Sequence, residues 1–153
     1  MSAAIFLFTP PFTQLNTPYP ATAYLKGFLN TKNISAFQAD LGIEVTIALF
    51  SKIGLQELFA SIDTTKELSA NAQRIISLKD EYIKTIDAVI LFLQGKNPSL
   101  APLISKRDFL PEAERFAQTD DLVWAFGSMG NQDKAKHLAT LYLEDLSDLI
   151  KEC

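Results

Sequence analysis

Residues 5–45, "IFLFTPPFTQLNTPYPATAYLKGFLNTKNISAFQADLGIEV", decide the fold, because they span the first strand-to-helix connection and the second strand. The stretch begins with continuously apolar residues, a pattern typical of a strand that is covered on both faces in a parallel sheet. Pro10 and Pro11 end this strand, because proline has no N–H to donate to a neighbouring strand. We therefore predict a buried core strand over residues 3–8, followed by a rigid loop.

A helix and a second strand come after the loop. Thr17 is a candidate N-cap, and the helix then carries an apolar stripe at helical spacing, formed by Ala21, Tyr24, Leu25, Phe28 and Leu29. Residues 33–40 predict the second strand, and residues 43–62 predict a second helix. This order indicates a partial Rossmann-like β-α-β-α unit with two parallel strands.

No convincing strand is predicted after residue 62. Residues 64–94 read as one long helix with an apolar stripe from Leu68 to Leu93, closed by Gly95. Residues 132–151 read as a final amphipathic helix. The predicted fold class is α/β at the N-terminus followed by an all-helical region, predominantly helical overall. We expect an α/β unit at residues 1–63 and a helical region at 64–153, packed as one compact domain.

The composition is that of a globular protein. The 153 residues are 48% hydrophobic and 21% charged, and the net charge is -4. The acidic balance argues against nucleic acid, which needs a basic surface, and against an anionic membrane surface. No apolar run reaches the roughly 20 residues that span a bilayer. Cys153 is the single cysteine, so no internal disulfide forms within one chain, and we expect a cytoplasmic protein.

A sheet of two parallel strands is incomplete, because such a pair is rarely stable alone and its apolar edges invite pairing. Three alternatives remain open at this point: helices cover the edge, a second molecule completes the sheet, or later strands belong to a longer chain. The last residues, 146–153, read as helix without a capping glycine. We expect an N-terminal fragment, and a homodimer formed through the long helices, where Ile83 and Ile86 lie, or across the sheet.

The opening stretch resembles the N-terminal cobalamin-binding-type domain of B12-binding radical SAM proteins. The resemblance is carried by the apolar strand, by Pro10-Pro11, by the later prolines of the loop, by Tyr24-Leu25 with the next apolar pair, and by Asp40 near the end of the second strand. It covers about 40 of the 153 residues. It implies a doubly wound parallel sheet with a corrinoid at the carboxyl ends of the strands, where open α/β sheets bind ligands.

The resemblance also implies which residues face the ligand. Residues 9–19 would lie beside the corrinoid, with the prolines holding the loop rigid. The implied cofactor-binding residues are Pro10, Pro11, Thr13, Gln14, Asn16, Thr17 and Asp40. The alternative interpretation is a stiff connection between strand and helix whose polar residues serve as caps.

The chain lacks the motifs that would make it an enzyme by itself. It has no Asp-x-His-x-x-Gly motif to ligate cobalt and no Cys-x-x-x-Cys-x-x-Cys motif for a 4Fe-4S cluster. The resemblance therefore implies that SAM and the cluster belong to the remainder of the parent chain, with no catalytic residue here. We expect cobalamin to bind this chain weakly or not at all. The alternative function is a standalone, mostly helical protein-interaction module without a cofactor.

Other candidate sites have simpler interpretations. Residues 127–130, "GSMG", with Asp133 and His137 suggest a hydrolase, but the flanking helices do not fit a nucleophile elbow. Asp120 and Asp121 fit helix capping better than a cation site. The carboxylates of the last helix, Glu144, Asp145 and Asp148, predict a solvated face. Phe116, Trp124 and Phe126 predict core positions.

Overall fold

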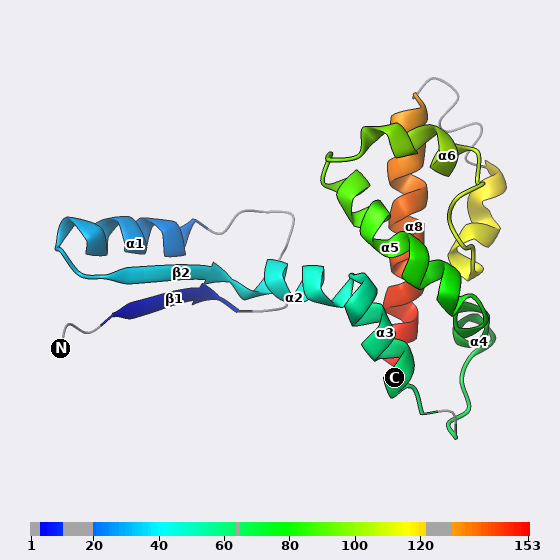
Figure 1. Ribbon diagram of the computed structural model, residues 1–153, viewed down its shortest axis with the longest axis horizontal. Helices are drawn as coiled ribbons and strands as arrows, with labels where there is room; N and C mark the ends of the chain where they lie inside the picture. The colour runs from blue at the N-terminus through cyan, green and yellow to red at the C-terminus, as the bar shows by residue number, and fades with distance from the viewer. Residues whose placement is uncertain (1–3, 11–19, 64, 122–129) are drawn as a thin grey trace. The chain divides into compact units, whose positions relative to one another are not determined.

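The computed structural model describes residues 4–10, 20–63, 65–121 and 130–153, and the chain divides into two compact units (Figure 1). Unit 1 is Met1–Ala48 and unit 2 is Leu49–Cys153. The division between the units lies earlier in the sequence than the boundary after residue 63 that the sequence analysis predicts between the α/β part and the helical part. The predicted fold class is confirmed, since a parallel two-stranded sheet is followed by a helical region.

Unit 1 contains the β-α-β arrangement that the sequence predicts. Strand β1 (Ile5–Thr9) is followed by helix α1 (Ala21–Thr31) and strand β2 (Ala36–Asp40), and the two strands pair in parallel. A parallel pair needs a long crossover, because the chain must return along the sheet before it can run in the same direction again. Helix α1 supplies that return.

The two faces of this sheet differ. Gln38 of β2 donates its Nε2 hydrogen to Thr22 Oγ1 of α1 at 3.2 Å, so α1 lies against the face that carries Gln38. Side chains alternate along a strand, and Phe6 pairs with Phe37 in the register. The opposite face therefore carries Phe6, Phe8 and Phe37, which we call the phenylalanine face.

The phenylalanine face is open to solvent. Phe6 is 57% exposed, Phe8 is 51% exposed and Phe37 is 59% exposed. The rings of Phe6 and Phe8 lie with their centroids 5.9 Å apart. The prediction of a strand buried on both faces is therefore wrong, because the described part of unit 1 supplies a covering helix on one face of the sheet.

Helix α1 also leaves its apolar stripe outside. Tyr24, Leu25 and Phe28 are all exposed, Tyr24 by 76%, whereas the polar Thr22 is buried against the sheet. The stripe was expected to pack on the strands. Tyr24, Leu25 and Phe28 instead stay exposed, while Ala21 and Leu29 of the same stripe are half-buried.

Unit 2 is helical. Its elements in the described residues are α3 (Lys52–Ser61), α4 (Ala70–Ser77), α5 (Lys79–Leu93), the 3-10 helix η1 (Pro98–Leu100), α6 (Ala101–Ser105), the 3-10 helix η2 (Glu114–Asp121) and α8 (Asn131–Glu152). The predicted final helix is confirmed in α8. Among the described residues, no helix is long and apolar enough to cross a membrane.

The single helix predicted over residues 43–62 is two helices. Helix α2 (Leu41–Leu49) ends before Ser51, and α3 starts afresh at Lys52. Ser51 Oγ accepts the Gly54 N–H at 3.0 Å, and Asp87 Oδ1 accepts the Lys52 N–H at 2.8 Å. These two acceptors satisfy amides that a helix start leaves unpaired, which stabilises the break.

The long helix predicted over residues 64–94 is also divided. It becomes α4 and α5, which meet at Leu78. Ser69 Oγ accepts the Ala72 N–H at 3.1 Å and so begins α4. The predicted end at Gly95 is correct: this glycine has a φ of 74°, which suits a residue without a side chain after a helix.

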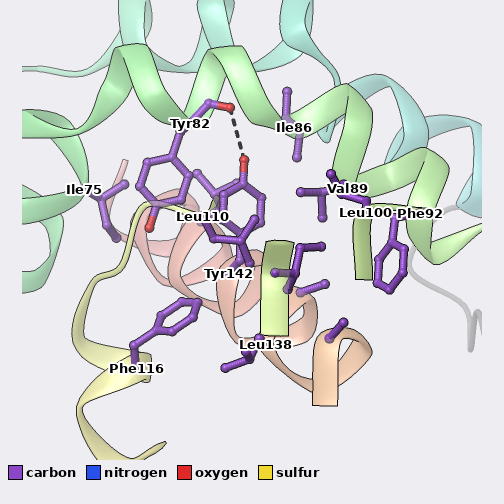
Figure 2. Packing of buried hydrophobic residues seen from close by; sticks show 14 of the residues in the cluster. Ile75, Tyr82, Ile86, Val89, Phe92, Leu100, Leu110, Phe116, Leu138 and Tyr142 are labelled. Atoms are coloured by element: carbon purple, nitrogen blue, oxygen red, sulfur yellow. Dashed lines mark hydrogen bonds between the residues drawn. The ribbon is translucent and has the colours of Figure 1, made fainter. Parts of the chain in front are cut away.

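Helix α8 is the centre of unit 2. It packs against α4, α5, α6 and η2 (Figure 1). Its inward positions, Leu138, Tyr142, Leu146 and Leu149, recur every three or four residues and are almost fully buried. Figure 2 shows two of them, Leu138 and Tyr142, packed among the core residues of unit 2.

The apolar stripe of α4 and α5 is covered inside unit 2. Ile75, Ile86 and Val89 are 0% exposed, and Ile83 packs against the same core. Ile86 therefore has no surface to offer to a second copy of the chain. A homodimer across the sheet of unit 1 stays a prediction.

Candidate functional site

The candidate site lies at the carboxyl edge of the two parallel strands. The register pairs Thr9, the last residue of β1, with Asp40, the last residue of β2. Pro10 follows Thr9 directly, so the structure brings Pro10 and Asp40 to the same edge of the sheet, as expected. The carboxyl edge is where open α/β sheets bind their ligands.

The polar groups at this edge have defined local roles. Asp40 Oδ1 accepts the Ile43 N–H at 3.1 Å and so supports the start of α2. Thr9 is buried at 4% exposure, whereas Asp40 is half-buried. The arrangement of these described groups can accept and donate hydrogen bonds around a ligand, but it offers no nucleophile paired with a base.

The other predicted cofactor-binding residues cannot be placed. Pro11, Thr13, Gln14, Asn16 and Thr17 lie outside the described residues, as does the expected N-cap role of Thr17. Helix α1 begins at Ala21, and Pro20 occupies its N-cap position. The fit of this loop to a ligand therefore stays a prediction.

The hydrolase and cation interpretations gain nothing from the geometry. Asp133 forms an ion pair with Lys136 at 3.9 Å within α8, and residues 127–129 lie outside the described part. In the ranges that the structure describes, no group of three or more His, Cys, Asp or Glu side chains could hold a metal ion. Phe116 is a core residue, as predicted, while Trp124 and Phe126 lie outside the described ranges.

Asp145 is a buried acid that the sequence interpretation missed. It was expected on a solvated face with Glu144 and Asp148, but it is 0% exposed. Its Oδ1 accepts the Arg115 N–H at 3.1 Å. Burial raises the pKa of the Asp145 carboxyl, and the Arg115 N–H partly opposes this rise. The spacing held a signal, since Asp145 follows Tyr142 by three residues and so falls on the buried face of α8.

Two tyrosines form a polar seam in the same core. Tyr82 of α5 and Tyr142 of α8 stack with ring centroids 4.9 Å apart. Tyr142 Oη donates to the Tyr82 carbonyl at 3.1 Å, the dashed line in Figure 2, and lies 3.0 Å from Thr85 Oγ1. Burial raises the pKa of both phenols. The tyrosine pair joins α5 to α8. Both tyrosines are fully buried, so we interpret the pair as structural.

No protein-family model matches the chain, and the searches of curated proteins and of solved structures find no match.

Proposed function

We propose that unit 1 is the opening β-α-β of a cobalamin-binding-type domain and supplies part of a corrinoid-binding surface in a B12-binding radical SAM protein. The observation that supports this most is the exposed phenylalanine face on a parallel strand pair. Parallel sheets in α/β proteins have helices on both faces. A doubly wound sheet would add further strands beside this pair and helices over Phe6, Phe8 and Phe37.

The energetics favour a covered surface. Apolar surface left in water costs roughly 25 cal/mol per Å², and the exposed phenylalanines are joined by Tyr24, Leu25 and Phe28 on α1. The same unit is also poor in charge. The charged side chains of residues 1–48 are Lys26, Lys32, Asp40 and Glu44. Few charges and much exposed apolar surface are typical of a part that is covered in its complete assembly.

The ligand would lie at the carboxyl edge of the sheet. Thr9, Pro10 and Asp40 form its described border, and the connection of residues 11–19 would form the side. Thr13, Gln14, Asn16 and Thr17 would offer neutral hydrogen bonds to the corrinoid. Residues 1–153 would contribute no catalysis, because SAM and a 4Fe-4S cluster would be held downstream in a cytoplasmic parent protein.

The reading frame beyond Cys153 tests the parent protein directly. We expect further strands with apolar runs and a Cys-x-x-x-Cys-x-x-Cys motif in that frame. A stop codon immediately after Cys153, or a continued frame without the motif, would contradict the assignment.

A spectroscopic titration tests the binding role. Hydroxocobalamin is titrated into the 153-residue chain and into a chain extended by the downstream strands. We expect weak or no binding to the shorter chain, because one wall cannot bury most of a ligand, and at least tenfold tighter binding to the longer one. Gln14→Ala with Asn16→Ala should weaken binding to the longer chain, and Gln94→Ala in unit 2 is the control. Equal affinities of the two chains would contradict the proposal that the shorter chain contains only part of the binding site.

The closed core of unit 2 favours a second candidate function, a helical protein-interaction module. Among the described residues, every apolar side chain of the buried core lies between Leu55 and Leu149. A module of this kind works without a cofactor. A strictly monomeric chain in light scattering, with no change in the hydroxocobalamin spectrum for either the short or the extended chain, would favour it over the corrinoid role.

A further inference from the structure

Two polar atoms in the core of unit 2 are buried without a protein partner of normal geometry. They are Tyr82 Oη of α5 and Asp145 Oδ2 of α8, and neither forms a hydrogen bond with another described residue. Buried polar side-chain atoms in folded proteins are mostly hydrogen-bonded, either to protein or to an ordered water, because burial without a partner forfeits the bonds that solvent would make. Both atoms therefore point to a partner that is not a described side chain.

The stacked tyrosines direct the Tyr82 hydroxyl towards α8. Figure 2 shows the two rings head to tail: Tyr142 reaches from α8 to the Tyr82 carbonyl, and the Tyr82 ring runs from α5 in the opposite direction. Asp145 follows Tyr142 by three residues, about one turn along α8, and is 0% exposed. Burial raises the pKa of the Tyr82 phenol, and the charge of the neighbouring Asp145 adds to that rise.

Both side chains are fixed by other contacts. The Tyr82 ring stacks on Tyr142 with the centroids 4.9 Å apart. Asp145 Oδ1 accepts the Arg115 N–H at 3.1 Å, which orients the carboxyl group. The two remaining atoms have complementary chemistry, since a phenol donates a hydrogen and a carboxyl oxygen accepts one, yet they form no direct hydrogen bond. A group that joins them has to accept from one and donate to the other.

We propose that one buried water molecule bridges Tyr82 Oη and Asp145 Oδ2, accepting the phenol hydrogen and donating to the carboxyl oxygen. A buried water makes about three hydrogen bonds to otherwise unsatisfied polar groups. Asn71 of α4 is placed to supply the third, because its side chain lies beside the Asp145 carboxyl and partly opposes the rise that burial causes in the pKa of that group.

A water fits this place better than a metal ion. In the part of the chain that the structure describes, no group of three or more His, Cys, Asp or Glu side chains could hold a metal. The bridge also does not require one protonation state of Asp145, because a protonated carboxyl donates to water and a carboxylate accepts from it. It would join α5 to α8 and, through Oδ1 and the Arg115 N–H, to η2. The bridge lies in unit 2 and does not depend on the proposed corrinoid role of unit 1.

A high-resolution crystal structure of the full chain tests the bridge directly. We expect one peak of solvent density within hydrogen-bonding distance, about 2.7–3.2 Å, of both Tyr82 Oη and Asp145 Oδ2. A direct hydrogen bond between these two atoms would overturn the proposal. So would a side chain from elsewhere in the chain that bonds to both of them, or the lack of any density between them.

A matched pair of variants tests the bridge in solution. Magnetic relaxation dispersion of ¹⁷O water reports long-lived internal waters by the amplitude of the dispersion. Tyr82→Phe removes the proposed donor, so its amplitude should fall by the contribution of one water. Tyr142→Phe removes the other hydroxyl of the stack, which bonds to the Tyr82 carbonyl instead, and should keep the amplitude of the unmodified chain. Equal amplitudes in all three chains, or a fall in Tyr142→Phe alone, would contradict the bridge.

Discussion

Unit 1 and unit 2 both contain helices with an apolar stripe, but only unit 2 buries its stripes among the described residues. Phe92 of α5 is 1% exposed, whereas Phe28 of α1 is 58% exposed. The two helices are comparable in pattern, and the difference lies in what surrounds them. Helix α5 faces α8 and α3, while α1 meets the two strands through its polar Thr22 side. An apolar stripe thus predicts that a helix packs against a partner, but it does not predict where in the sequence that partner lies.

The largest effect should come from breaking the closed core. Ile86→Asp would place a carboxylate at a position that is 0% exposed. The penalty for burying an unpaired charge is several kcal/mol, comparable with the whole stability of a domain of about 5–15 kcal/mol. We expect loss of the cooperative thermal transition in circular dichroism. Ile53→Asp, at an exposed position of α3, should keep the transition. A folded Ile86→Asp chain with an altered mass would instead place Ile86 in an interface.

Alkaline pH should weaken unit 2 next most strongly. The pKa values of Tyr82 and Tyr142 are raised by burial in the folded state. Their contribution to the free energy of unfolding is complete below the pKa of about 10 that tyrosine has in the unfolded chain. It is lost as the pH rises towards the pKa values of the folded state. Above pH 10 the free energy of unfolding should fall by about 1.4 kcal/mol per pH unit for each tyrosine. Urea unfolding between pH 8 and pH 12 measures this, and Tyr142→Phe should halve the slope. A flat profile would mean that the phenols are not buried.

A smaller loss is expected from Tyr142→Phe at neutral pH. The substitution removes the hydroxyl that bonds to the Tyr82 carbonyl and to Thr85 Oγ1, and it leaves the ring stack in place. Loss of a buried hydrogen bond costs about 1–3 kcal/mol when a partner stays unsatisfied. Tyr24→Phe, on the exposed α1, should change the free energy of unfolding by less than about 0.5 kcal/mol. Equal effects of the two variants in urea unfolding would contradict the assigned difference in burial.

The smallest effect on stability is expected at the phenylalanine face. Phe6→Ser with Phe8→Ser should leave the unfolding of unit 2 within about 0.5 kcal/mol of the unmodified chain, because these rings lie in unit 1. Light scattering should show weaker self-association, since the predicted homodimer would use this apolar surface. An unchanged dimer mass in the double variant would exclude the phenylalanine face as its interface.

The sequence predicted the elements better than their surroundings. The order β1, α1, β2 could be inferred from local signals, namely the apolar run, the prolines and the helical spacing. Burial of β1 could not be predicted in this way, because it depends on layers that the described part of residues 1–48 does not contain. The break at Leu78 had no glycine or proline to mark it, so the continuous stripe across Ser77 and Lys79 indicated one helix.

The sites divide in a similar way. Pro10 and Asp40 were predicted at one edge because carboxyl ends of parallel strands meet there. Asp145 was missed because three carboxylates close in sequence suggested a solvated face. Its carboxylate accepts the backbone N–H of Arg115, 30 residues earlier in the sequence, and no local pattern reveals that contact.

The central place of α8 has a consequence for how the chain is made. Tyr142 bonds to the carbonyl of Tyr82, 60 residues earlier, and Ser69 Oγ donates to the Glu152 carboxylate across 83 residues. During synthesis, the ribosome therefore releases α4 and α5 well before the helix that covers them. Their apolar residues stay exposed until α8 has left the exit tunnel, so unit 2 cannot complete its folding on the ribosome until its last turn has emerged. Apolar surface that is exposed before its partner segment is made is prone to aggregation.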